Sequence, residues 1–215
     1  MSEEILERLK KAVIEFDAEA AEKWAKEAVE KGVDPIQAAN ALTEGIRQIG
    51  DGFGRGEYFL PDLVMAGEAM KRALPPLEEA IKKAGKTREA LAKFVIGTVA
   101  GDIHDIGKTI VITLFQAAGF DVVDLGVDLP AEKFVEAVKE HKPDVLGLSA
   151  LMTMTMFEQI KVIEALKATG IRDGVKVMVG GGAITPDFAQ MIGADGYASN
   201  APEAVEEAKK MLELE

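Results

Sequence analysis

The sequence predicts two domains of different class: an antiparallel four-helix bundle over residues 1–86 and an α/β domain with a doubly wound, five-stranded parallel sheet over residues 87–215. Three observations lead to this prediction. Up to about residue 84, apolar residues recur every three or four positions, which is the period of amphipathic helices. Beyond that point, short runs rich in β-branched residues alternate with helical segments, as in a parallel sheet covered by helices. The polar segment AGKTREA, residues 84–90, separates the two patterns.

Four amphipathic stripes make up the helical half. The first two are Leu6, Leu9, Val13 and Phe16, then Ala21, Trp24 and Ala28. The third begins at Asp34-Pro35, an N-cap followed by proline, and contains Ala39, Leu42, Ile46, Ile49 and Phe53. After the glycine-rich GDGFGRGEY, the fourth contains Leu63, Ala66, Met70 and Leu74. Pro75-Pro76 is expected to end or kink this helix, and the short connections favour a bundle.

Five apolar runs predict the strands of the second half: residues 94–99, 121–125, 145–148 and 175–179, and a weaker run at 196–198. Helical segments lie near residues 107–119, 130–141, 156–169, 186–192 and 201–213. In a domain of this kind, ligands bind at the carboxyl ends of the strands.

Composition excludes several classes of function. The net charge of −12 and the absence of clustered Lys and Arg argue against nucleic-acid binding. Without cysteine, neither disulfides nor thiolate metal sites are available. The N-terminal MSEEILERLKK is unlike a secretory signal, and no apolar run approaches membrane-spanning length. We therefore expect a cytoplasmic protein that does not contact the membrane.

The stretch GDIHDIGK, residues 101–108, places one of only two histidines in the loop after the first α/β strand. Three interpretations of His104 remain open on these grounds. It is a loop residue capping the next helix, or a metal ligand whose other ring nitrogen is held by the carboxylate of Asp102, or a general base. The last is disfavoured because the loops offer no cysteine or elbow serine for it to activate. His141, at a helix end, is expected to be structural.

The other strand ends are small and hydroxyl-bearing. The third strand runs into SALMTMT, residues 149–155, and the fourth into VGGGAIT, where Gly180, Gly181 and Gly182 remove side chains from a wall. A G-x-G-x-x-G fingerprint is absent after the first strand. These features predict a bulky, buried ligand between the first, third and fourth strands.

Three elements in this order resemble a known signature. Asp102-x-His104-x-x-Gly107, then Ser149-x-Leu151, then Gly181-Gly182 is similar to the D-x-H-x-x-G…S-x-L…G-G pattern of base-off/His-on cobalamin-binding domains. Residues 56–71, GEYFLPDLVMAGEAMK, resemble the cap helix in the cobalamin module of methionine synthase and in corrinoid proteins of methyltransferase systems. The resemblance covers essentially the whole chain and implies a four-helix-bundle cap followed by a flavodoxin-like cobalamin-binding domain.

The resemblance also implies a role for each matching residue. His104 would be the lower ligand of cobalt, Asp102 would hold the Nδ1 hydrogen of His104, and Thr155 would complete a relay behind Asp102. From the cap, Phe59, Leu63, Ala66 and Met70 share one helical face, on which Leu63 is expected to be core, and Glu44 is a candidate for the corrin edge. The implied cofactor-binding set is Gly101, Asp102, Ile103, His104, Asp105, Ile106, Gly107, Ser149, Leu151, Thr153, Gly181, Gly182, Ala201, Phe59 and Met70.

The implied function is a methyl carrier that is not catalytic alone. Methylcobalamin or a related corrinoid would receive a methyl group from a substrate-specific methyltransferase and pass it to an acceptor methyltransferase. A reductive activation protein is a further partner that the resemblance allows. The methyl donor (methanol, methylamine, betaine or methoxyaromatic) is left open. The alternatives are a cobalamin-based sensor, which usually has a DNA-binding domain, and a cobalamin-binding subunit of a mutase, which does not normally bring a helical cap. Methyl transfer is expected to need separation of the domains about a hinge at residues 85–88.

Overall fold

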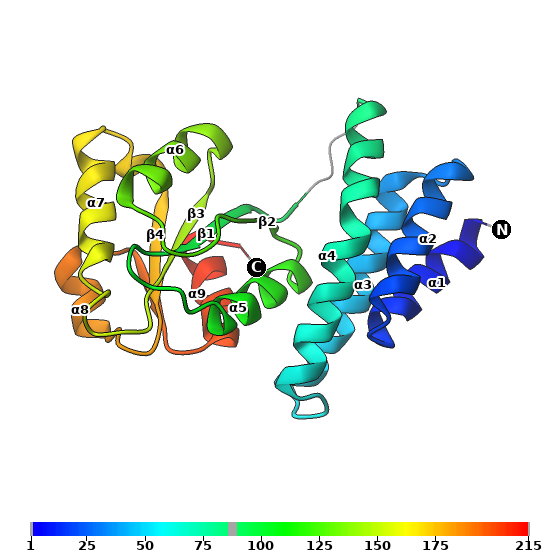
Figure 1. Cartoon of the computed structure of the whole chain (residues 1–215), viewed down its shortest axis with the longest axis horizontal. Coiled ribbons are helices and arrows are strands. Elements are labelled where there is room, and N and C mark those ends of the chain that lie inside the picture. Colours follow the sequence, from blue (N-terminus) through cyan, green and yellow to red (C-terminus); the bar gives the residue numbers. More distant parts are fainter. Residues whose placement is uncertain (1, 86–89, 215) are drawn as a thin grey trace. The chain divides into compact units, whose positions relative to one another are not determined.

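The structure is a computed structural model that describes residues 2–85 and 90–214. The chain forms two compact units, one built on the four N-terminal helices and the other on the sheet and its helices (Figure 1). The predicted boundary between residues 86 and 87, and most of the predicted hinge, lie outside the described residues.

The helical unit consists of α1 (Ser2–Ile14), α2 (Ala18–Glu30), α3 (Pro35–Gly54) and α4 (Leu60–Lys83). Two of these helices begin at aspartate N-caps. The Asp17 carboxylate accepts from the N–H of Ala20 at 2.9 Å, and the Asp34 carboxylate accepts from the N–H of Ile36 at 3.1 Å. Each helix buries one apolar stripe, so the predicted bundle is confirmed.

The structure corrects the bundle prediction at Phe16 and at the first of the two outcomes expected for Pro75-Pro76, the end of the helix. Phe16 lies beyond the end of α1 with φ 62°, where its ring meets the edge of Tyr58 at a centroid distance of 6.1 Å. The helix α4 does not end at Pro75-Pro76 but continues to Lys83. Its buried stripe runs from Ala73 to Leu77 and Ile81 rather than through Leu74, which is only half-buried.

Burial explains why α4 passes its prolines. Pro75 is exposed and Pro76 is partly exposed, so neither occupies the packed stripe. A proline inside a helix costs about 3 kcal/mol, and this helix contains two. Burying Leu77 and Ile81 beyond the prolines returns about 1.5–3 kcal/mol each, which offsets a large part of that cost.

The α/β unit has a five-stranded, all-parallel sheet in the order β2-β1-β3-β4-β5. Its strands are β1 (Lys93–Thr98), β2 (Asp121–Asp124), β3 (Val145–Ser149), β4 (Lys176–Gly180) and β5 (Gly196–Ala198). The helices are α5 (Ile106–Ala117), α6 (Ala131–His141), α7 (Glu158–Ala168), α8 (Pro186–Ile192) and α9 (Ala201–Met211), with a 3₁₀ turn η1 (Arg172–Gly174). The doubly wound, flavodoxin-like prediction is confirmed.

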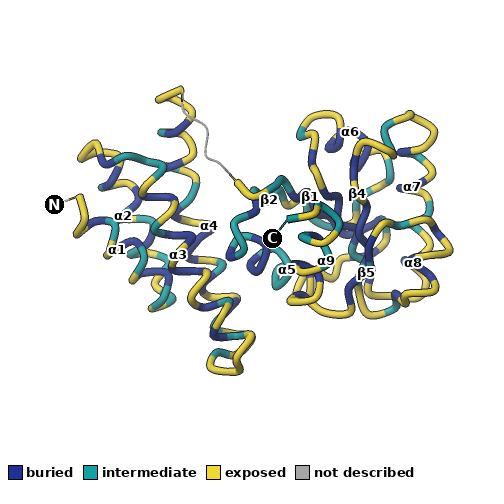
Figure 2. Tube along the Cα trace, turned by 180° about the vertical axis from the view of Figure 1, so that it is seen from behind, coloured by how far each residue is buried: buried dark blue, intermediate teal, exposed yellow. Residues whose placement is uncertain are grey.

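Helices cover both faces of this sheet (Figure 1). Every second residue of the strands points to one face, where Leu146 of β3 and Val177 of β4 pack with α6, α7 and α8 in one core. On the other face, Phe94 of β1 stacks on Phe115 of α5 at 3.9 Å, and Gly196 of β5 lies against Met211 of α9. Figure 2 shows the central strands buried along their length while the helices keep an exposed side. No helix in the described part of the chain is both long and apolar enough to cross a membrane.

Candidate functional site

The site lies where the chain leaves β1 and β3 toward opposite faces of the sheet. The two strands are neighbours, and their last residues, Thr98 and Ser149, are register partners. After Thr98 the chain turns to α5, whereas after Ser149 it turns to α7. Adjacent strands whose connections diverge in this way leave a crevice between their loops, and ligands of α/β proteins bind there.

Asp102, His104 and Thr155 meet in this crevice as predicted. The Asp102 carboxylate is fully buried. Its Oδ1 accepts a hydrogen bond from the ring Nδ1 of His104 at 2.7 Å and one from the His104 backbone N–H at 3.1 Å. Its Oδ2 accepts from the Thr155 hydroxyl at 2.6 Å. The Asp102 carboxylate therefore joins its own loop to the loop of Thr155, 53 positions away in the sequence.

These hydrogen bonds keep the carboxylate ionised. Burial on its own raises the pKa of Asp102, because it penalises the charged form. The donors of Thr155 and His104, together with the backbone N–H of Leu151 at 2.8 Å, outweigh burial and hold the pKa well below its usual range. An ionised Asp102 can only accept, so Nδ1 of His104 carries the hydrogen of this bond and Nε2 is the ring nitrogen left for another partner.

The free ring edge of His104 is accessible. The side chain is 48% exposed, and within residues 2–85 and 90–214 no hydrogen bond engages Nε2. Large apolar side chains are exposed on the same two loops: Ile103, Ile106, Leu151, Met152 and Met154. Within the described residues, no three acidic or histidine side chains gather as a ligand set. One accessible imidazole, with exposed apolar side chains on the same two loops, would suit a metal whose other ligands come from its own macrocycle.

A row of short side chains crosses the sheet beside the crevice. Ser149 is in register with Thr98, Gly180 is in register with Ser149, and Ala198 with Gly180. Their chain neighbours belong to the core under α6–α8, so these residues face α5 and α9. The predicted Ala201 is buried at the start of α9, and a Cβ added at Gly107 of α5 would meet only open space. The sequence analysis missed Thr98 and Ala198 in this row, although each lies at a strand end.

The other predicted glycines bring the β3 and β4 loops into contact. Gly181 has φ 124°, and a Cβ there would lie 1.9 Å from the carbonyl oxygen of Ala150. A Cβ at Gly182 would lie 2.8 Å from Cδ1 of Leu151. The remaining predicted residues, Gly101, Asp105 and Thr153, are exposed on the same loops.

The structure separates the predicted cap residues. Phe59 is the N-cap of α4, with its side chain 70% exposed, while Met70 is buried on the packed stripe together with Leu63 and Ala66. Leu63 lies in the bundle core, as expected, and Ala66 and Met70 lie on the same buried stripe, so these three residues do not form an exposed face with Phe59. The exposed apolar residues next to Phe59 are Leu60, Val64 and Met65, which the helical period alone did not indicate. Glu44 pairs with Lys10 and Arg47 on the surface of the bundle.

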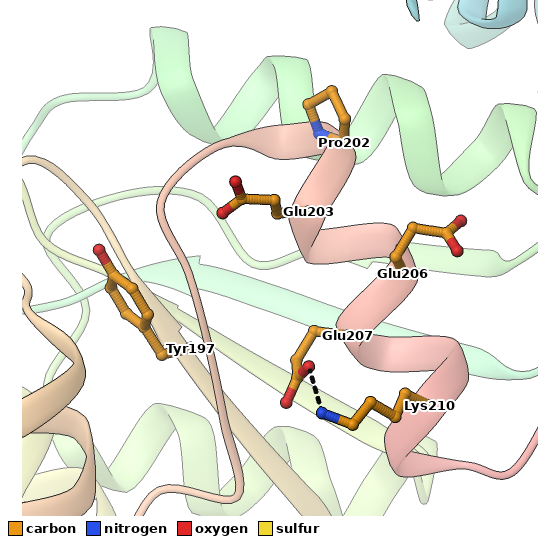
Figure 3. A pocket seen from close by; sticks show the side chains of 6 residues that line it. All are labelled: Tyr197, Pro202, Glu203, Glu206, Glu207 and Lys210. Carbon is orange, nitrogen blue, oxygen red and sulfur yellow. Dashed lines mark hydrogen bonds and ion pairs between the residues drawn. The ribbon is translucent and has the colours of Figure 1, made fainter.

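A hollow of about 570 Å³ lies beside the edge strand β5, with Tyr197 and residues of α9 around it (Figure 3). Its lining is Tyr197, Pro202, Glu203, Glu206, Glu207 and Lys210, of which Glu207 and Lys210 form an ion pair at 3.4 Å. The strands β3 and β4 separate β5 from β1. None of the predicted site residues lines this hollow.

Two residues behind the His104 loop were missed. Asp128, between β2 and α6, makes two hydrogen bonds with the backbone of residues 101 and 102. Lys108 of α5 is buried and forms an ion pair with Asp124 at the end of β2. The only signal in the sequence is their position beside predicted strand ends, which many loop residues share.

Comparison with known proteins agrees with this geometry. Two families, each described as a B12 binding domain, match residues 5–78 and residues 92–206. The chain is 46% identical over 213 residues to the trimethylamine corrinoid protein of Methanosarcina barkeri, covering 99% of this chain and 98% of that protein. It is also 46% identical to dimethylamine corrinoid protein 1 of Methanosarcina mazei, covering 98% and 97%.

A solved structure matches nearly the whole length of this chain. The methanol:cobalamin methyltransferase complex of Methanosarcina barkeri contains a chain that matches with a TM-score of 0.83 and 33% identity, covering 98% of this chain and 80% of that one. The resemblance inferred from the motifs is thus confirmed. This chain belongs to the B12-binding corrinoid proteins of methyltransferase systems, with cobalamin as its cofactor.

Proposed function

We propose that this chain is a methyl carrier that binds cobalamin with His104 as the lower ligand of cobalt, in place of the cofactor's own base. One observation carries the proposal: an accessible imidazole whose Nδ1 is bonded to a buried, ionised carboxylate at 2.7 Å and whose Nε2 is free. Cobalamin, when bound, supplies a cobalt ion that accepts and releases a methyl group. The protein supplies the ligand, the pocket and access for its partners.

Asp102 and Thr155 control the imidazole. The carboxylate holds the Nδ1 hydrogen, which orients the ring and makes Nε2 a stronger donor to a metal. Nε2, on the exposed edge of the ring, is left for the metal. The Thr155 hydroxyl keeps the carboxylate in its place at 2.6 Å. The two hydrogen bonds thus hold the ring in one orientation, with Nε2 available to the metal.

The row of short side chains is the proposed place for the nucleotide tail of the cofactor. Ser149 offers a hydroxyl to the tail, and Gly180 and Ala198 leave it room on the face between α5 and α9. For the upper side of the corrin we propose a cover made by Phe59 with the exposed Leu60, Val64 and Met65, in place of the buried Met70. These apolar side chains would exclude water from the methyl group.

Partners follow from the carrier role. We propose one methyltransferase that loads the methyl group and a second that removes it, together with a reductive activation protein. The relatives named as trimethylamine and dimethylamine corrinoid proteins favour a methylated amine as the methyl source. The cytoplasmic location and the separation of the two domains during transfer stay predictions.

Electron paramagnetic resonance tests the ligand. Protein labelled with ¹⁵N and loaded with unlabelled cobalamin should show, in the Co(II) form, coupling to one protein nitrogen. His104→Ala should lose that coupling and keep the cofactor, because the row of short side chains proposed to hold the nucleotide tail is intact. His141→Ala is the matched control, since it removes the only other histidine of the chain, and it should leave the spectrum unchanged. Coupling to the cofactor's own base in the wild type would refute the proposal.

A further inference from the structure

The segment that connects β2 to α6, residues 125–130, lies against the backbone of the loop that carries His104. We propose that Asp128 in this segment is a positioning residue for His104, acting through the main chain of Gly101 and Asp102. The proposal rests on the proposed function, in which His104 ligates cobalt. It assigns a task to a residue whose hydrogen bonds go to the main chain of the loop and not to the imidazole.

Asp128 holds two consecutive residues of the loop. Its backbone N–H donates to the carbonyl oxygen of Asp102 at 2.9 Å, and its side-chain Oδ1 accepts from the N–H of Gly101 at 2.7 Å. The side chain of Asp102 is held from the opposite direction by the β3 loop, through Thr155 and Leu151. Asp102 is therefore fixed at both its backbone and its carboxylate.

The backbone of Asp128 has φ 56°, in the left-handed region that most residues with a side chain avoid. Aspartate tolerates this conformation better than most residues, and glycine adopts it freely. Gly126, two positions earlier, also has positive φ. Aspartate at position 128 adds what glycine lacks, a carboxylate that accepts the hydrogen bond from Gly101.

The rest of the segment is anchored to the elements on either side of the His104 loop. Thr98 of β1 donates its N–H to Gly126 at 3.0 Å and accepts from the N–H of Leu129 at 3.1 Å. The Thr98 hydroxyl donates to the carbonyl oxygen of His104 at 3.1 Å. These bonds make the segment a fixed support rather than a free loop.

An ion pair ties the same support to α5. Lys108 lies in the first turn of that helix, where both burial and the helix dipole disfavour a cation. Its ammonium is paired with Asp124, whose Oδ1 also accepts from the N–H of Gly126 at 2.9 Å. The start of α5, directly after the His104 loop, is thereby linked to the segment that contains Asp128.

The consequence for ligation is geometric. A coordinate bond needs the Nε2 lone pair to point at the metal, and partners behind a ligating histidine commonly contribute ~10–100-fold in affinity or activity. If Asp128 no longer accepts from Gly101, residues 101 and 102 gain freedom and the imidazole spends less time on the metal axis. The row of short side chains proposed for the nucleotide tail, at the ends of β3 and β4, is unaffected.

The test compares Asp128→Gly, Asp128→Ala and Asp128→Asn, with Asp173→Ala on η1 as a control. In the Co(II) form we expect Asp128→Gly and Asp128→Ala to lower the ratio of His-bound to His-free cobalt ~10-fold, while cobalamin is retained. Asp128→Asn keeps an acceptor oxygen for Gly101 and should restore most of the ratio. Asp173→Ala should match the wild type.

Hydrogen exchange of the protein without cofactor gives a second measurement. Residues 99–105 should exchange faster in Asp128→Gly than in the wild type, and Asp128→Asn should lie close to the wild type. This comparison stands even if a variant loads cofactor poorly. A wild-type spectrum without a protein nitrogen would refute the proposed function. A wild-type spectrum with one, unchanged in Asp128→Gly and Asp128→Ala, would overturn the role of Asp128 alone.

Discussion

Asp102 is the most constrained side chain of the site. Its two oxygens accept from His104 twice, from Thr155, and from the backbone N–H groups of Leu151 and Met152. All five partners donate, so the position requires a group that has no hydrogen to give. A carboxylate meets that condition and an amide does not, because the NH₂ of asparagine would face donors.

Asp102→Asn should therefore destabilise the protein as well as alter ligation. We expect a loss of about 3 kcal/mol in the free energy of unfolding, since buried donors lose their acceptor. The measurement is urea unfolding of the cofactor-free protein, with Asp105→Asn as the exposed control on the same loop. Equal stability of the wild type and Asp102→Asn would contradict this reading of the hydrogen bonds.

The difference in the free energy of unfolding between the wild type and Asp102→Asn should depend on pH. At neutral pH Asp102 is ionised in both the folded and the unfolded chain. Below about pH 4 the unfolded chain takes up the proton first, because folding holds the pKa of this carboxyl lower. Stability of the wild type then falls with pH, while asparagine does not titrate. The advantage of the wild type should shrink between pH 5 and 2, and a constant difference would argue against an ionised Asp102.

Site residues could be predicted from the sequence where the interacting side chains are close together in the chain. The histidine and its aspartate are two positions apart, so their pairing follows from the motif. Asp128 and Lys108 could not be found in this way, because their partners lie on other segments and nothing in their residue type indicates them. Met70 was misplaced because a helical stripe looks the same whether it faces a bundle core or a ligand.

At the scale of elements, the strands were predicted within one or two residues. Buried runs of β-branched residues bounded by glycine and polar residues leave little choice of register or length. Helix α4 was the exception, since packing beyond Pro75 and Pro76 offsets a large part of the local cost of the prolines. Tertiary burial of this kind is not visible in a local pattern.

The β3 and β4 loops offer a matched pair of substitutions. Gly181→Ala should cost about 3 kcal/mol or more, because φ 124° is strained for alanine and the new Cβ would meet the Ala150 carbonyl oxygen. Gly182→Ala should cost within about 1 kcal/mol, since the atom in its way is the flexible end of Leu151. Thermal unfolding of both variants checks the order, and equal costs would contradict the close approach of the two loops.

For the whole molecule, the two units contain different parts of the proposed function. The α/β unit contains His104, the proposed ligand of cobalt, and the row of short side chains. The helical unit contributes exposed apolar residues at the start of α4. Phe59, Leu60, Val64 and Met65 lie within seven positions of one another, on a chain with a net charge of −12. Exposed apolar groups of this kind mark contact sites for a ligand or a partner.

Substitutions in α4 should separate the surface from the core. Phe59→Ala and Met65→Ala should leave stability within about 0.5 kcal/mol but speed photolysis of bound methylcobalamin, because solvent would reach the upper face more readily. Leu63→Ala, at a fully buried position, should cost about 2–5 kcal/mol. Photolysis that is unchanged in both surface variants would remove the case for a cover at this place.

The hydrogen bond between the Thr155 hydroxyl and the Asp102 carboxylate has a consequence for folding kinetics. The hydrogen bond from Thr155 spans 53 positions. It joins loops that follow β1 and β3, which are neighbours in the sheet but are separated in the sequence by α5, β2 and α6. We therefore expect it to form after these two strands have paired. Contacts that form after the rate-limiting step affect the unfolding rate and leave the folding rate almost unchanged. Thr155→Val, which removes the hydroxyl at constant shape, should then unfold ~30-fold faster for a loss of about 2 kcal/mol and refold at the wild-type rate. Thr155→Ser should behave as the wild type in stopped-flow circular dichroism. A slower refolding of Thr155→Val would mean that this corner of the site assembles early and guides the pairing of the sheet.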